Sequence, residues 1–85
     1  MRSEKAPLVY VRMKRLPSGL IAASSDEVPG LHMAERSAAD VERKAPIILQ
    51  ALMHEKGREV RAVAVESNRP DTYAWVLIPA MAAAL

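Results

Sequence analysis

The chain has 85 residues, 51% of them hydrophobic and 26% charged, a composition that suits one small folded domain and excludes a disordered segment. It contains no cysteine, which excludes disulfides, thiolate metal sites and cysteine nucleophiles and favours a cytoplasmic location. With no phenylalanine and a single tryptophan the core should be thin, so we expect one domain over residues 1–85 that forms homo-oligomers.

Residues 8–14 are predicted to form the first strand, because β-branched and aromatic residues dominate and the side chains alternate in character. The apolar face consists of Val9, Val11 and Met13. Residues 1–16 hold five Lys or Arg and one Glu, a local positive charge that acidic surfaces or phosphates attract. A plain solvated strand face is the alternative interpretation. The candidate partner-binding residues are Tyr10, Arg12, Lys14 and Arg15.

A turn at residues 17–19 should connect this strand to a second one over residues 20–24, which makes a hairpin. A Ser-Asp-Glu-Val-Pro-Gly loop follows at residues 25–30, and a short third strand is predicted at residues 31–35. In such a loop Ser and Asp bond the local backbone, proline fixes φ, and glycine permits a sharp reversal. We interpret the motif as a structural turn, with partner contact as the alternative. Its residues are Asp26, Val28, Pro29 and Gly30.

The clearest pattern is that of an amphipathic helix. Ser37 and Asp40 are placed to cap its N-terminus, and Gly57 is placed to end it. Pro46 removes a backbone donor in the middle, so we expect a kink or two helical pieces. Apolar residues at spacings of three and four predict one buried stripe. The stripe consists of Ala38, Val41, Ala45, Ile48 and Leu52, with Leu49 beside them.

In the last third of the chain the predicted secondary structure is ambiguous at first and then favours a strand. Residues 60–66 have a β-like composition that also suits a helix, and residues 67–71 read as a turn. Residues 73–78 should form a strand, and their unbroken apolar run predicts burial on both faces. Residues 80–85 are expected to be a short helical or frayed end.

The predicted fold class is therefore α+β, in the order β-β-β-α-β with room for one further strand. We expect a mainly antiparallel sheet with one kinked helix on one face. The crossover through the helix should bring the strand after it parallel to the first strand. The uncovered face, which includes the basic side of residues 8–14, is where a partner is expected to bind.

No pattern in the sequence points to catalysis. His32 and His54 lie on different predicted elements without the spacing of metal ligands, so no metal site is expected. Three glycines in all exclude the glycine-rich phosphate loops, and no cluster of carboxylates or activated serine is present. We therefore expect a binding module rather than an enzyme, with no cofactor. The apolar run at residues 73–85 is shorter than the roughly 20 residues that span a bilayer, so no membrane association is expected.

Residues 19–31 (Gly-Leu-Ile-Ala-Ala-Ser-Ser-Asp-Glu-Val-Pro-Gly-Leu) resemble the HicB-like antitoxin domain, and most closely its small stand-alone relatives of unknown function. The resemblance extends over residues 8–57, with Ser37 in the place of the helix cap and Ala-Pro-Ile-Ile at residues 45–48 similar to the proline-broken helix of those relatives. Ile21 stands where the relatives usually carry tryptophan, and we expect no counterpart of the second, DNA-binding domain of many HicB proteins within these 85 residues. The matching loop residues are Ser25, Asp26, Val28, Pro29, Gly30 and Leu31.

This resemblance implies a partial RNase H-like fold without RNase H chemistry, and a partner that is a small toxin or nuclease. HicB-type antitoxins cap a small mRNA-cleaving toxin in a toxin–antitoxin system. One alternative is nucleic-acid binding by the basic first strand, because phosphate contacts need only cations. Another is a structural homo-oligomer whose exposed sheet pairs with itself.

Overall fold

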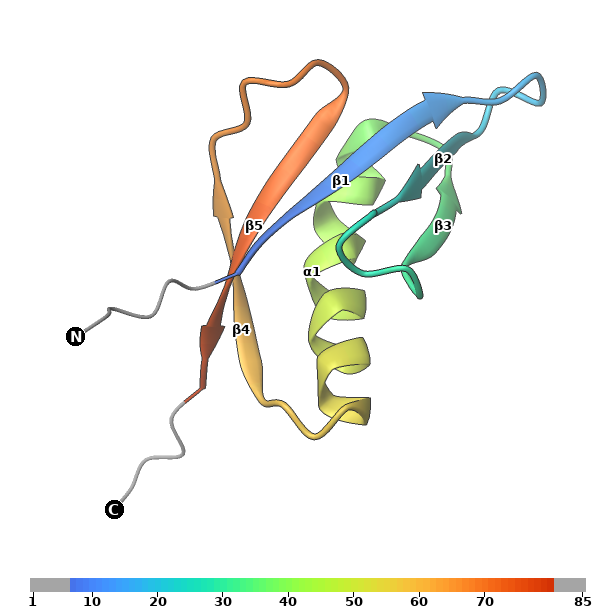
Figure 1. Ribbon diagram of the computed structural model, residues 1–85. Helices are drawn as coiled ribbons and strands as arrows, with labels where there is room; N and C mark the ends of the chain where they lie inside the picture. The colour runs from blue at the N-terminus through green and yellow to red at the C-terminus, as the bar shows by residue number, and fades with distance from the viewer. Residues whose placement is uncertain (1–6, 81–85) are drawn as a thin grey trace.

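The computed structural model describes residues 7–80, which form an α+β domain of one antiparallel sheet and one helix (Figure 1). The sheet has five strands in the order β3-β2-β1-β5-β4. The predicted α+β class is confirmed, and the ambiguous segment after the helix is the further strand. The elements are β1 (Leu8–Arg15), β2 (Ile21–Ser24), β3 (His32–Glu35), α1 (Ala38–Glu55), β4 (Val60–Val65) and β5 (Thr72–Pro79).

The expected parallel pairing after the helix is wrong. β4 follows α1 but takes the edge of the sheet, and β5 turns back to lie antiparallel between β4 and β1. The composition of the two strands explains this placement. β5 (Tyr-Ala-Trp-Val-Leu-Ile in its middle) is almost wholly apolar and gains most from neighbours on both sides. β4 (Val-Arg-Ala-Val-Ala-Val) carries a charge and small side chains that tolerate an edge.

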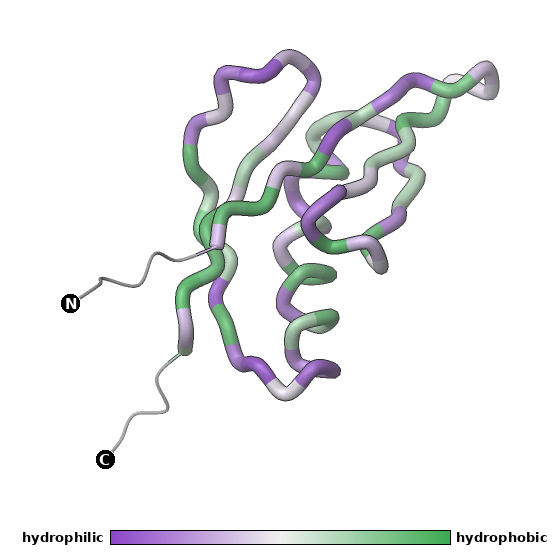
Figure 2. The backbone as a smooth tube through the Cα atoms, in the orientation of Figure 1, coloured by the Kyte–Doolittle hydropathy of each residue, from purple (hydrophilic) through white to green (hydrophobic). Residues whose placement is uncertain are grey.

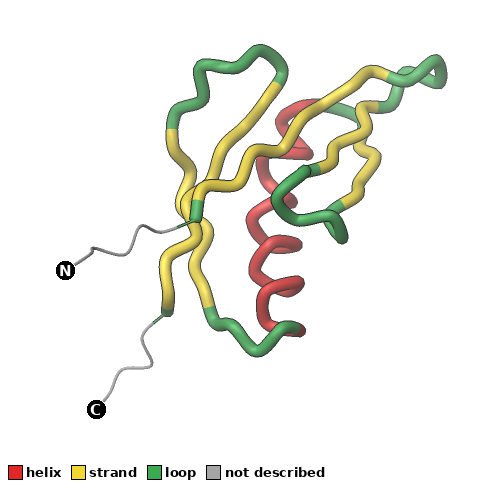
Figure 3. The backbone as a smooth tube through the Cα atoms, viewed as in Figure 1, coloured by secondary structure: helices red, strands yellow, loops and turns green. Residues whose placement is uncertain are grey.

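The core lies between α1 and the face of the sheet that α1 covers, as the tube views show (Figures 2 and 3). In β1, Val9 and Val11 are 2% and 0% exposed, so the predicted apolar face of this strand is the core face. Trp75 and Leu77 of β5 join them. The predicted burial of β5 on both faces is only partly correct. On the face that points away from α1, Ala74 is buried, whereas Ile78 remains 40% exposed.

The helix is capped as predicted: Ser37 Oγ accepts a hydrogen bond of 3.2 Å from the backbone N–H of Asp40. α1 ends just before Gly57, whose φ of +80° suits glycine. It runs unbroken through Pro46, so the expectation of two helical pieces is wrong. The buried stripe keeps the predicted Val41 and Ala45, but in the second half of the helix Leu49 and Met53 are buried, whereas Ile48 and Leu52 are only half-buried. The buried helix residues are Val41, Ala45, Leu49 and Met53.

Candidate functional site

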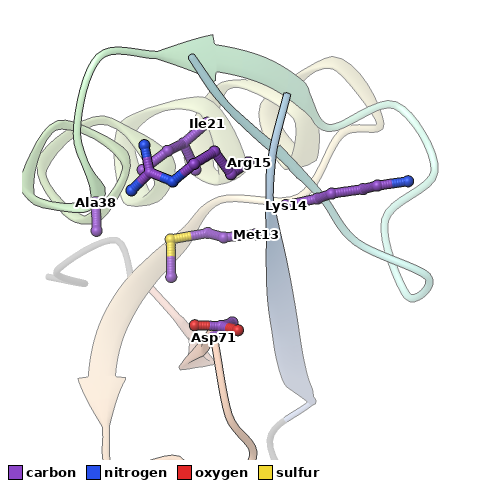
Figure 4. A pocket seen from close by; sticks show the side chains of 6 residues that line it. All are labelled: Met13, Lys14, Arg15, Ile21, Ala38 and Asp71. Carbon is purple, nitrogen blue, oxygen red and sulfur yellow. The ribbon is translucent and has the colours of Figure 1, made fainter. Parts of the chain in front are cut away.

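The four candidate partner-binding residues do not share one face. Strand alternation places Tyr10, Arg12 and Lys14 on the face of the sheet that α1 leaves uncovered, which we call the open face. Arg15 lies on the other face, and its guanidinium is directed toward Ala38 at the start of α1, whereas Lys14 projects away (Figure 4). The basic residues of β1 therefore lie on two different faces of the sheet.

The open face changes character along β1, from apolar at one end to basic at the other. Cross-strand pairing brings Leu8, Val76 and Val63 into one row at the first end. Leu8, Val65 and Ile78 are about 40% exposed, with values of 41%, 39% and 40%, which is high for side chains of this size. Arg12 and Lys14 lie at the other end of the same face. The apolar patch is defined as Leu8, Val63, Val65, Val76 and Ile78.

Tyr10 lies between the two ends and is already in contact with a cation. The guanidinium carbon of Arg69, in the loop between β4 and β5, lies 3.7 Å from the centre of the Tyr10 ring. This distance is typical of a cation–π contact, which favours arginine over an aromatic face. One side of the Tyr10 ring is therefore occupied within the chain, and Arg69 adds a further positive charge to the middle of the open face.

Arg12 is also engaged, by a carboxylate of the turn motif. Its Nη2 lies 2.7 Å from Asp26 Oδ1, and both side chains are largely exposed. Solvent screens an ion pair of this kind, so it contributes little stability and is readily exchanged for another acidic group. Lys14 makes no ion pair within residues 7–80. Both cations are thus accessible to an acidic partner.

The turn motif is a compact hydrogen-bonded unit that extends the sheet beside β1. Ser25 Oγ accepts a bond from the backbone N–H of Val28 and donates one to Glu27 Oε1, at 3.3 and 3.2 Å. The same Glu27 oxygen accepts a 3.0 Å bond from the backbone N–H of Tyr10. Val28 and Leu31 are 3% and 0% exposed and anchor the loop in the core. These contacts give the motif a structural role.

Glu27 is the most perturbed carboxylate of this unit. Partial burial acts to raise its pKa, but the opposing effects are together larger and the pKa lies below its usual value. They are the bond from the Tyr10 backbone, a bond from its own backbone, the Ser25 hydroxyl and the charge of Arg69. The ionised form is therefore the one that holds the loop against β1.

A cleft of about 410 Å³ lies on the side of the sheet where Arg15 and the start of α1 meet. Arg15 and Asp71 both line it, so its walls carry opposite charges. Asp71 adopts a left-handed φ of 52°, which aspartate tolerates in turns. Within residues 7–80, no group of three or more His, Asp or Glu side chains is placed to hold a metal ion.

Several contributors to the open face were not identified from the sequence. Arg69 was assigned to a turn, and Val63 and Val65 belong to the segment whose secondary structure was ambiguous. The alternation of Val63 and Val65 with alanine was the available signal, since it is the pattern of a strand with one exposed face. The contact between Arg69 and Tyr10 depends on a loop conformation that no local pattern predicts.

No helix in the described part of the chain is both long and apolar enough to cross a membrane. The expected helical or frayed end at residues 80–85 lies, apart from Ala80, outside the described residues. The chain matches no protein-family model, no curated protein and no solved structure.

Proposed function

We propose that this chain is a non-enzymatic protein-binding domain of the HicB-like antitoxin or inhibitor type, which neutralises a small toxin or nuclease by covering part of its surface. The family assignment and the partial RNase H-like topology belong to this proposal. They are supported by the turn motif at residues 25–31 and by the order of three antiparallel strands and a capped helix. The fully antiparallel sheet departs from the parallel crossover that we expected.

The observation that carries the proposal is the open face of the sheet. One helix covers one side of five strands, and the other side presents the apolar patch with Arg12 and Lys14 beyond it. A partner with an apolar centre and acidic groups at one edge would complement this surface, because apolar burial provides affinity and charge orients the complex.

Nucleic-acid binding is less well supported by the same surface. Arg12 is paired with Asp26, and one side of the Tyr10 ring is covered by Arg69 rather than free for a base. The exposed aliphatic side chains give bases no aromatic platform. If nucleic acid were nevertheless the partner, affinity would fall steeply with salt and would be lost in the double variant Arg12→Ala, Lys14→Ala.

The test is co-expression with a small ribonuclease toxin encoded beside the gene, followed by measurement of RNA cleavage and of binding by titration calorimetry. We expect the chain to inhibit cleavage and Ile78→Asp to weaken binding at least about tenfold, because it places a charge on an exposed side chain of the apolar patch. Ile47→Asp is the matched control, since Ile47 is 64% exposed on α1. Absence of inhibition, or equal losses in the two variants, would contradict the proposal.

A further inference from the structure

A second cavity, of about 350 Å³, opens at the end of the core where the last turn of α1 faces the start of β1 and the end of β5. Its apolar walls include Val9, Val28, Met53 and Leu77, none of them more than 6% exposed. The volume falls in the lower part of the range for small-molecule sites, roughly 300–1,000 Å³. Because these residues are almost fully buried, the cavity borders the core rather than opening into it, and a ligand would lie along this edge of the core.

Two cations line the same cavity. Lys56 and Arg58 follow α1 directly and line the cavity with the apolar residues, and neither forms an ion pair within residues 7–80. Glu27 also lines it, but its Oε1 already accepts hydrogen bonds from the Tyr10 backbone and the Ser25 hydroxyl. The three charged residues leave the lining with a net charge of +1.

Backbone hydrogen bonds engage two of the last carbonyl groups of α1 beside this cavity. The backbone N–H groups of Lys56 and Arg58 both donate to Met53 O, and that of Gly57 donates to His54 O. These bonds satisfy carbonyl groups that would otherwise present the negative end of the helix to the cavity. An anion at the mouth therefore meets the two side-chain cations, while the carbonyl oxygens of Met53 and His54 are already engaged.

We propose that this cavity binds a medium-chain aliphatic carboxylate, with the chain between Val9, Met53 and Leu77 and the carboxylate at Lys56 and Arg58. The flexible thioether side chain of Met53 adapts to an aliphatic chain. A second copy of the protein is a poorer occupant, since it would bring the same two cations to the site. The inference does not depend on the protein partner proposed above, because the cavity floor at Val9 and Leu77 lies on the core face of the sheet. Of the apolar patch, only Leu8 also lines the cavity.

Octanoate is a suitable probe, with titration followed by amide and methyl NMR of the full chain. We expect saturable shifts at Val9, Val28, Met53 and Leu77. The double variant Lys56→Ala, Arg58→Ala should bind octanoate roughly tenfold more weakly, as loss of a charge-assisted contact predicts. Arg61→Ala is the matched control, because Arg61 is an exposed cation of the open face and should leave the affinity unchanged.

Two further measurements make the test decisive. Octanol, which has the same chain without the charge, should bind more weakly than octanoate. Val60→Phe should reduce binding because it fills the mouth from a half-buried position, and circular dichroism checks that this variant folds. The proposal is overturned if the shifts map to the residues of the apolar patch other than Leu8, which also lines the cavity. It is likewise overturned if the shifts do not saturate or if octanol binds equally well. It is also overturned if the cavity residues shift on dilution of the protein alone, which would identify a second copy as the occupant.

Discussion

At the scale of single residues, one serine and one glutamate organise the loop that follows β2. β2 is too short to reach the backbone N–H of Tyr10, and the carboxylate of Glu27 takes the place of a strand neighbour there. Ser25, which is 5% exposed, holds that carboxylate and also the backbone of Val28. A buried hydroxyl with both its donor and its acceptor used is costly to remove, so Ser25 fixes the loop on which Arg12 finds its acidic partner, Asp26.

The lowered pKa of Glu27 makes the stability of the fold depend on pH. A carboxyl group whose pKa is lower in the folded than in the unfolded chain stabilises the fold above its unfolded value of about 4.3, and this contribution is lost as the pH falls through the lower folded value. We expect Glu27→Gln to lose less stability than the wild type between pH 6 and pH 3. The difference should be about 0.5–1 kcal/mol, since solvent screens an exposed carboxylate. Urea unfolding at both pH values measures it, and equal losses in the two proteins would show that Glu27 does not hold the loop.

At the scale of the elements, the edge of the sheet at β4 is protected by α1. The backbone N–H groups of alternate β4 residues point away from β5, and at Ala62 this group donates to Gln50 Oε1 over 2.9 Å. Gln50 is half-buried. A side chain bound to an edge N–H blocks the addition of another strand, which is one way in which proteins avoid edge-to-edge association.

We expect Gln50→Leu to lower the free energy of unfolding by about 1–3 kcal/mol, because the N–H of Ala62 loses its acceptor. The same variant should associate more strongly than the wild type through the unprotected edge. Gln50→Glu, which keeps an acceptor oxygen, is the matched control for both effects. Urea unfolding and sedimentation velocity provide the two readouts. Wild-type stability and wild-type association in Gln50→Leu would show that the bond to Ala62 does not protect the edge.

Local patterns predicted the elements well and their assembly poorly. The alternation in β1 and the Ser37 cap depend on near neighbours in sequence, so they could be read directly. β5 takes a central position and β4 the edge because β5 gains more from neighbours on both sides. This outcome depends on a comparison between distant segments of the chain. The contacts of Arg69 with Tyr10 and of Gln50 with Ala62 join residues that only the tertiary fold brings together. Arg15, in contrast, is separated from Arg12 and Lys14 by strand alternation alone, once β1 is extended by one residue beyond Lys14.

At the scale of the whole molecule, the fold has one covered face and one open face. A single 18-residue helix buries the core side of the sheet, and within residues 7–80 nothing else is available to cover the other side. Along β1 the open face passes from the apolar patch, through Tyr10, to Arg12 and Lys14, and Arg69 lies over Tyr10. A single cation, Arg61, lies beside Ile78 at the opposite end. This arrangement gives the surface a direction, so that a partner with an apolar and an acidic end would bind in one orientation.

The most direct test of the open face as the binding surface is methyl NMR of the chain with and without the toxin encoded beside its gene. We predict that the methyl signals of Leu8, Val65, Val76 and Ile78 change on binding, because these side chains enter the interface. The signal of Ile47, exposed on α1, should remain unchanged. A change at Ile47 with none at Leu8, Val65, Val76 and Ile78 would contradict a partner on the open face.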